Sequence, residues 1–177
     1  MHRKEAVSQS LNALINGDVD EAVAVNSNYY GGAGTLYEKE TVEIIRCILE
    51  SEYTPDPAIK SKVLNPLRVA AAAMELWGAS EVQESIDVSG DWTYKLNPRD
   101  VMQLLYTAGL EQHRLKRLRD SGVKAVAVRT RNEKPAAPCL EVLGKTFPIA
   151  KAPPLPHSDS ACQCSYAAVP EVEAGQE

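Results

Sequence analysis

The chain has 177 residues, 44% of them hydrophobic and 24% charged, with a formal net charge of −5. This composition excludes a disordered or fibrous chain, and the negative charge argues against indiscriminate binding to nucleic acid or anionic membranes. The most apolar stretch, residues 67–78, has about half the length of a membrane-spanning helix, and no secretory signal opens the chain, so we expect a soluble protein without a membrane partner.

The first elements along the chain are predicted from apolar spacing. Residues 4–17 have apolar side chains at helical spacing and stop at Asn16-Gly17, which predicts a helix. Residues 19–27 form a shorter apolar stretch whose pattern fits a helix or a strand. The sequence NYYGGAGT at 28–35 must be a loop, because three glycines cannot sustain either regular structure.

The next helix has a clear start signal. Thr35 and Glu38 have the spacing of a capping box, in which each side chain accepts a hydrogen bond from the other residue's backbone amide. Residues 36–53 then place several aliphatic side chains on one side of a helix. We expect Pro55 and Pro57 to end it.

Two later helices are predicted from an asparagine followed by a proline. Asn65-Pro66 and Asn97-Pro98 each place an N-cap residue before a proline at the first helical position, where no amide hydrogen is missed. The helices that follow are expected to end at Gly78 and Gly122. Between them, residues 85–96 suggest a short hairpin or an extended arm.

After Gly122 the apolar pattern changes to a period of two. Residues 123–130 predict a strand, 131–138 a turn and 145–149 a return strand, and the sequence from 167 onward is typical of a solvated tail. The expected small core of this region consists of Val126, Val128, Leu143, Phe147, Ile149 and Leu155.

These elements define the expected fold class and domain organisation. We expect an α+β protein with a mostly helical body over residues 1–121. A small β-hairpin module follows over 122–168, closed by a Cys/His cluster, and residues 169–177 form a flexible tail.

Two glycine-containing segments have some features of phosphate-binding loops. Gly144-Lys145-Thr146 lacks the earlier glycine of a phosphate loop, because Cys139 stands there, and Phe147-Pro148 follows where such a loop opens a helix. The glycines of residues 31–34 come too early for a dinucleotide fingerprint. A flexible loop is the preferred interpretation of that segment.

The four cysteines form two groups in the sequence, one isolated cysteine in the first half of the chain and three in the last third. Cys47 lies on the apolar side of a predicted helix and is expected to be a small buried hydrophobe. Cys139, Cys162 and Cys164 bracket a proline-rich turn that contains His157, and three thiols with one imidazole could bind zinc. Two alternatives stay open: inert packed thiols, or a disulfide from Cys139 to Cys162 or Cys164. So few cysteines favour a reducing cytoplasm over a secreted scaffold.

A run of basic residues extends from 113 to 131. Arg114, Lys116, Arg117 and Arg119 lie near the expected end of a helix, where cations are favourable. They could form a solvated face, or they could contact nucleic acid or an acidic partner. No catalytic motif accompanies them, so we expect a protein that is not an enzyme.

The last third of the chain carries a series of motifs in a fixed order: a strand, an acidic turn, a cysteine, a Gly-Lys pair, an aromatic-proline pair, a proline-rich turn with a histidine, and a closing Cys-x-Cys. Here they are GVKAVAVRT at 122–130, NEK at 132–134, Cys139, Leu143-Gly144-Lys145, Phe147-Pro148, APPLPHS at 152–158 and Cys162-Gln163-Cys164. This order resembles the C-terminal module of phage Mu F-like head-morphogenesis proteins, also called minor capsid proteins.

The resemblance covers about a quarter of the chain and has two departures. The family has a further cysteine where this chain has Ala136, and an arginine where it has Gln163. A weaker similarity links residues 68–91 to the helix and trailing strand near the end of some phage small terminase subunits.

Together these features imply a non-enzymatic phage- or prophage-type structural or assembly protein. It would contact itself or other phage structural proteins, in the host cytoplasm or in the virion. The alternative is a DNA-packaging factor that binds nucleic acid through the basic run. No cofactor is certain; zinc at Cys139, His157, Cys162 and Cys164 is the candidate.

Overall fold

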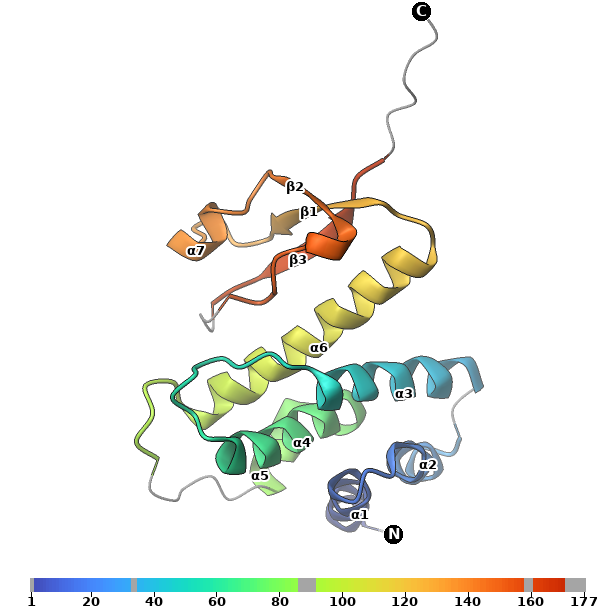
Figure 1. The fold of residues 1–177 in the computed structure, drawn as a ribbon. Coiled ribbons are helices and arrows are strands. Elements are labelled where there is room, and N and C mark those ends of the chain that lie inside the picture. The colour runs from blue at the N-terminus through green and yellow to red at the C-terminus, as the bar shows by residue number, and fades with distance from the viewer. Residues whose placement is uncertain (1, 33–34, 86–91, 158–160, 171–177) are drawn as a thin grey trace, which may run out of the picture. The chain divides into compact units, whose positions relative to one another are not determined.

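The computed structural model describes residues 2–32, 35–85, 92–157 and 161–170 (Figure 1). The chain forms two compact units, Met1–Leu110 and Glu111–Glu177, which we call the N-terminal and C-terminal units. Seven α-helices and a three-stranded antiparallel sheet are found in the described ranges, which confirms the α+β class. None of these helices has the length and apolarity that crossing a bilayer requires.

The N-terminal unit is built from helices. They are α1 (Arg3–Ile15), α2 (Val19–Tyr29), α3 (Thr35–Glu50), α4 (Ser61–Trp77), α5 (Ala79–Ser85) and the first part of α6 (Pro98–Asp120). Helix α1 packs on α2 and α4, and α3 packs on α4. Their shared core includes the fully buried side chains of Val7, Ile45, Ile48, Met102 and Leu105.

The undecided segment after α1 is helical. Asp18 caps α2, since its Oδ1 accepts the Glu21 amide hydrogen at 3.0 Å. The helix continues to Tyr29, so the expected loop begins two residues later than predicted, at Tyr30. Gly31 and Gly32 have φ angles of 85° and 92°, which only glycine adopts readily.

Helix α3 buries the predicted apolar side, because Ile45 and Ile48 have no exposed surface and Cys47 is buried as expected. It ends at Glu50, ahead of Pro55, where the buried Arg68 satisfies backbone groups. The Arg68 guanidinium donates to the carbonyl oxygens of Ile48 (3.4 Å) and Tyr53 (2.9 Å). The Arg68 side chain of α4 therefore satisfies carbonyl groups at the end of α3, before either proline is reached.

At the start of α3, the Thr35 side chain of the predicted capping box lies outside the described part. The Glu38 carboxylate accepts a hydrogen bond from the Ser27 hydroxyl at 2.7 Å. This bond joins the beginning of α3 to α2.

The predicted start of α4 at Asn65-Pro66 is wrong. The helix begins at Ser61, and Pro66 lies inside it. The amides of Val63 and Leu64 already bond to the Lys60 carbonyl oxygen, at 2.9 and 3.0 Å. A proline in the second turn removes only one further backbone hydrogen bond, and burial of Leu64 stabilises the added turn.

The segment between α4 and α6 also differs from expectation. Gly78 (φ 82°) ends α4 as predicted, but the short helix α5 follows at once. Its Val82 is fully buried, which explains the extra helix. Residues 92–97 contain a bend at 94–96 and no strand, and residues 86–91 of the expected hairpin lie outside the described ranges.

Both predicted ends of α6 are confirmed. Asn97 Oδ1 accepts the Asp100 amide hydrogen at 2.9 Å. At the other end, the amides of Gly122 and Val123 bond to the carbonyl oxygens of Arg119 (2.9 Å) and Leu118 (3.0 Å). This is a Schellman motif, and it requires the positive φ of Gly122, 81°.

The C-terminal unit contains the sheet, whose strand order is β2-β1-β3. Strand β1 (Ala125–Thr130) pairs antiparallel with β2 (Thr146–Pro148), which confirms the hairpin. Strand β3 (Cys164–Ala168) pairs with the other side of β1, from Thr130↔Cys164 to Val126↔Ala168. The sequence did not predict β3; its last two residues were assigned to the tail.

One face of this sheet forms a small core. All six predicted core residues belong to it: Val126, Val128 and Leu155 are buried, and Leu143, Phe147 and Ile149 pack against them. Leu115 and Leu118 of α6 pack there too, which explains why the units divide within α6, after Leu110, and not at residue 121.

Candidate metal centre

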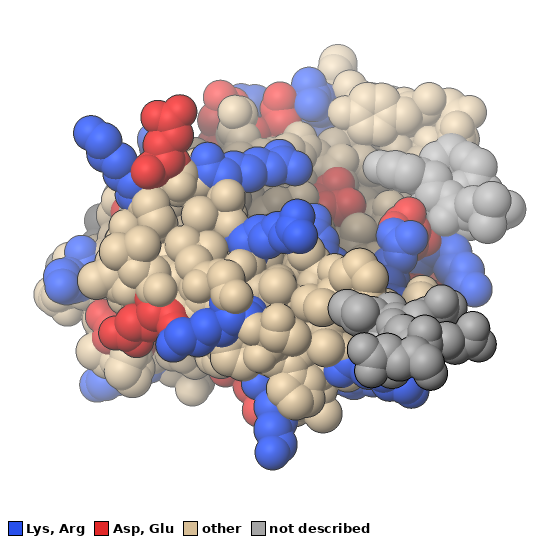
Figure 2. All heavy atoms as spheres, turned by 90° about the horizontal axis from the view of Figure 1, so that it is seen from above, with Lys and Arg blue, Asp and Glu red and all other residues tan. Residues whose placement is uncertain are grey.

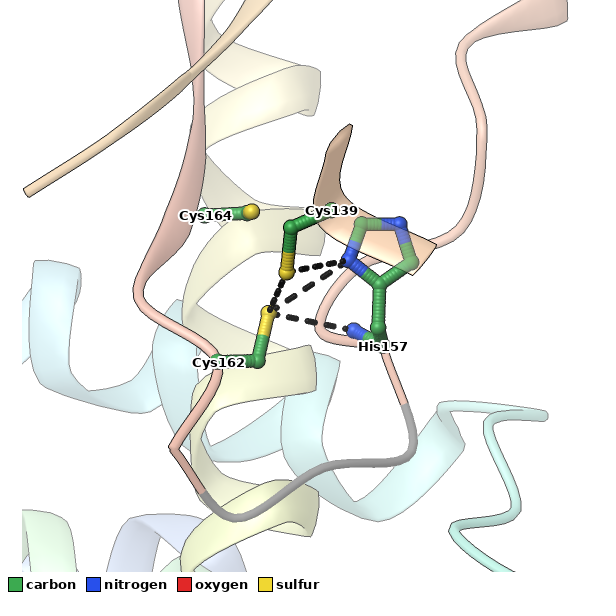
Figure 3. A group of neighbouring side chains, drawn as sticks. All are labelled: Cys139, His157, Cys162 and Cys164. Atoms are coloured by element: carbon green, nitrogen blue, oxygen red, sulfur yellow. Dashed lines mark hydrogen bonds between the residues drawn. The ribbon is translucent and has the colours of Figure 1, made fainter. Parts of the chain in front are cut away.

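Four side chains from separate segments of the C-terminal unit meet beside the sheet (Figure 3). Cys139 lies on the short helix α7 (Ala137–Leu140), and its amide bonds to the Ala136 carbonyl oxygen. His157 follows the 3₁₀ helix η1 (Ile149–Lys151) and the proline-rich turn, Cys162 precedes β3, and Cys164 is the first residue of β3. The turn thus brings the upstream thiol back to the Cys-x-Cys pair.

The ligand atoms of these residues, which we call the Cys/His cluster, are close together. All four lie within 4.8 Å of one another. Cys139 Sγ is 3.8 Å from Cys162 Sγ, and His157 Nδ1 is 3.3 Å from the first sulfur and 3.5 Å from the second. A tetrahedral zinc ion with ordinary bond lengths separates two sulfurs by about 3.8 Å and a sulfur from a nitrogen by about 3.5 Å. The cluster could therefore hold a metal ion.

Burial sets the protonation of the cluster. It raises the pKa of Cys139 and of Cys164 and lowers the pKa of His157. The imidazole is thus neutral at neutral pH, as metal ligation requires, and the two buried thiols are protonated until a cation replaces their protons. Metal binding here must release protons.

The alternatives for the cysteines can be judged from the same geometry. All four cysteines are free thiols in the structure, including the pair at 3.8 Å. Cys139 is 1% exposed with a raised pKa, whereas a nucleophilic cysteine is accessible and has a lowered one. This arrangement fits metal ligands better than a nucleophile.

One of the two positions that depart from the Mu F-like pattern has a packing role. Ala136, where the pattern that the sequence resembles has a cysteine, is the N-cap of α7 and packs against the small core. The cluster is complete with four ligands without it.

The Gly-Lys-Thr triplet is part of the scaffold, as predicted. Gly144 takes a positive φ of 73° and Thr146 begins β2, so no helix follows the glycine. A phosphate loop would need that helix.

The predicted nucleic-acid-binding residues lie on the last turns of α6 and are exposed. At 100° per residue, Arg114 and Arg119 border the buried stripe of the helix, and Lys116 and Arg117 lie on the opposite side. Arg114 also pairs with Glu111 at 2.7 Å. The helix therefore does not gather the four cations on one face, and Figure 2 shows Lys and Arg side chains scattered between uncharged surface.

One polar residue of this unit was missed in the sequence. Glu111 is 5% exposed, and its Oε2 accepts the Tyr166 amide hydrogen of β3 at 3.0 Å. The Tyr166 hydroxyl in turn donates to the Pro153 carbonyl oxygen in the proline-rich turn. The available signal was the position of Glu111, four and seven residues before Leu115 and Leu118 on the buried stripe.

No model of a known protein family matches this chain, and no curated protein or solved structure is similar enough to be matched to it.

Proposed function

We propose that the C-terminal unit is a zinc-stapled module of a non-enzymatic structural or assembly protein. The observation that carries the proposal is the placement of three sulfurs and one imidazole nitrogen within 4.8 Å of one another. Residues 139–164 supply all four ligands, so the metal would close the turn onto the sheet.

Zinc is favoured by the ligand set. Three thiolates with one imidazole are typical of structural zinc sites, where four protein ligands fill the tetrahedron. A catalytic zinc keeps one position open for water or substrate. The Cys/His cluster has no ligand to spare, which supports a structural role.

The assembly role rests on the order of motifs in the sequence. It is similar to the C-terminal module of phage Mu F-like head-morphogenesis proteins, and the Cys/His cluster occupies the segments that carry the similarity. We therefore propose a phage- or prophage-type protein that contacts copies of itself or other structural proteins, in the host cytoplasm or in the virion.

Zinc content tests the metal part of the proposal. Protein purified without chelator should carry close to one zinc per chain, and so should Cys47→Ser, whose thiol lies in the other unit. Cys139→Ser, Cys162→Ser and Cys164→Ser should each weaken zinc binding by more than about tenfold, since even second-shell losses cost that much. Equal zinc content in the Cys164→Ser and Cys47→Ser variants would overturn the assignment of four ligands.

Nucleic-acid binding is the second candidate, favoured by the distribution of charge. Residues 1–110 contain nine Lys and Arg against sixteen Asp and Glu, whereas residues 111–177 contain ten against eight. The C-terminal unit is therefore basic within an acidic chain, as in proteins that contact phosphates.

Ionic strength separates the two candidates. Binding to duplex DNA through phosphates weakens steeply as salt rises, and replacing Lys116 and Arg117 with alanine should lower that slope. Self-association measured by sedimentation at several salt concentrations, with no DNA present, should occur for an assembly protein. Association that appears only with DNA would favour the packaging factor.

A further inference from the structure

Cys162 differs from the other members of the Cys/His cluster in access and in hydrogen bonding. It is half-buried, whereas Cys139 and Cys164 are buried. Its sulfur accepts the backbone amide hydrogen of His157 at 3.3 Å, and it lies 3.5 Å from the imidazole Nδ1. Oxidation of a cysteine depends on access of the oxidant to its sulfur, and Cys162 is the least buried cysteine of the cluster.

We propose that Cys162 is a modification site for peroxides, and that its oxidation links it to Cys139 and opens the metal centre. This inference rests on the proposed zinc site and adds its regulation. The structural basis is the 3.8 Å separation of the two sulfurs, together with the incomplete burial of the Cys162 residue.

The chemistry is balanced with hydrogen peroxide as the oxidant. The Cys162 thiolate attacks one peroxide oxygen, the O–O bond breaks, and a sulfenic acid forms with release of hydroxide. The Cys139 thiol then loses its proton and its sulfur attacks the adjacent Cys162 sulfur, the S–S bond forms, and the S–O bond breaks with release of a second hydroxide. The two sulfurs lose two electrons in total, the peroxide gains them, and the hydroxides take up protons to give water.

The geometry also selects the partner thiol. A disulfide needs its sulfurs at about 2.05 Å, so the pair at 3.8 Å must close by less than 2 Å. Cys162 precedes β3 and takes part in no strand pairing, so it can make this shift. Cys164 is fixed opposite Thr130 in the sheet. The favoured product is therefore Cys139–Cys162.

Linking these two residues removes two of the four zinc ligands together. A site with one thiolate and one imidazole binds zinc far more weakly than a complete tetrahedron. Peroxide should consequently release the metal, and reduction in the presence of zinc should restore it.

The test uses the full chain, loaded with zinc and titrated with hydrogen peroxide. Released zinc is followed with a chromogenic chelator, and the disulfide is located by peptide mass mapping without reduction. We expect zinc release in proportion to a Cys139–Cys162 linkage, reversed by a phosphine reductant with added zinc. Cys47→Ser should behave like the parent chain, and Cys162→Ser should form no linkage from Cys139.

Several outcomes would overturn the proposal. They are a predominant linkage that involves Cys164, release of zinc without a disulfide, or a cluster that stays intact at peroxide levels that oxidise free cysteine. Mapping the reduced, metal-free chain after peroxide treatment separates this proposal from the zinc site. If the chain never binds zinc, the zinc site is refuted. Mapping the metal-free chain would still show whether peroxide forms the Cys139–Cys162 disulfide.

Discussion

Gly109 lies on α6 directly against Ile48 of α3. A Cβ atom added there would lie 2.7 Å from the Ile48 Cα and closer still to the Ile48 side chain. Backbone atoms cannot move aside as a flexible side chain can, so the position admits no methyl group. Glycine stands here although alanine favours a helix by about 1 kcal/mol.

Gly109→Ala should therefore destabilise the N-terminal unit by about 1–3 kcal/mol, since overpacking exceeds the gain in helix propensity. Urea unfolding of this variant measures the loss. The matched control is Gln103→Ala on the exposed side of α6, which should change the free energy of unfolding by less than about 0.5 kcal/mol. Equal stability of Gly109→Ala and the parent chain would contradict the close approach.

The residues of the Cys/His cluster were predictable because of their chemistry. Cysteines and a histidine on both sides of a proline-rich turn indicate a site whatever the exact backbone path. Glu111 gave only the weaker signal of its position on the buried stripe of α6, since an acidic residue on a helix is normally solvated. Only the position of β3 shows that its carboxylate has a backbone amide to bind.

For the helices and strands, prediction from the sequence succeeded where a local sequence signal was strong. The two ends of α6 were predictable because Asn97 and Gly122 act through their own backbone neighbourhood. The start of α4 was not, because burial of Leu64 outweighs the local preference of Pro66. Strand β3 was missed because its sequence, CSYAA, has no β-branched residue and its pairing partner is more than thirty residues away.

The Glu111 contact between α6 and β3 gives a pH prediction. Burial raises the pKa of Glu111 above its ordinary value of 4.5, although the Tyr166 amide and Arg114 oppose the shift. A carboxyl group with a raised pKa favours the folded state most when it is protonated. The stability that protonated Glu111 contributes is thus fully present below pH 4.5, and it is lost as the pH rises through the folded-state pKa.

Glu111→Gln keeps an acceptor for the Tyr166 amide and removes the buried charge. We expect it to be at least as stable as the parent chain at neutral pH, with the difference shrinking as the pH falls through the folded-state pKa and staying constant below pH 4.5. Glu111→Ala leaves the amide without an acceptor and should cost about 1–3 kcal/mol. Urea midpoints across this pH range measure both. A glutamine variant as unstable as the alanine variant would show that the charge itself is needed.

At the scale of the whole molecule, the chain combines two cores of unequal size. The N-terminal unit has a large aliphatic core, whereas the C-terminal unit buries a few side chains around Val126 and Val128. A core this small supplies little free energy, and small units commonly depend on a metal. The metal should therefore matter to one unit only.

Chelation should make this difference visible in amide hydrogen exchange. Removing zinc should abolish protection of the Val126 and Val128 amides and leave that of Leu105 unchanged. Chelator added to Cys162→Ser provides the control, since that variant has little metal to lose. A uniform loss of protection along the chain would indicate that the two units fold together.

The two edge strands of the sheet, β2 and β3, are protected against pairing with further strands. On β2, Pro148 has no amide hydrogen to offer a further strand, and on β3 the central amide, that of Tyr166, is already bound by Glu111. Unpaired edge strands can pair with strands of other chains and cause aggregation. Prolines and inward-pointing charges on edge strands commonly prevent this. Copies of this protein that gather into a larger particle should thus meet through side-chain surfaces, and continuous intermolecular sheets should not form.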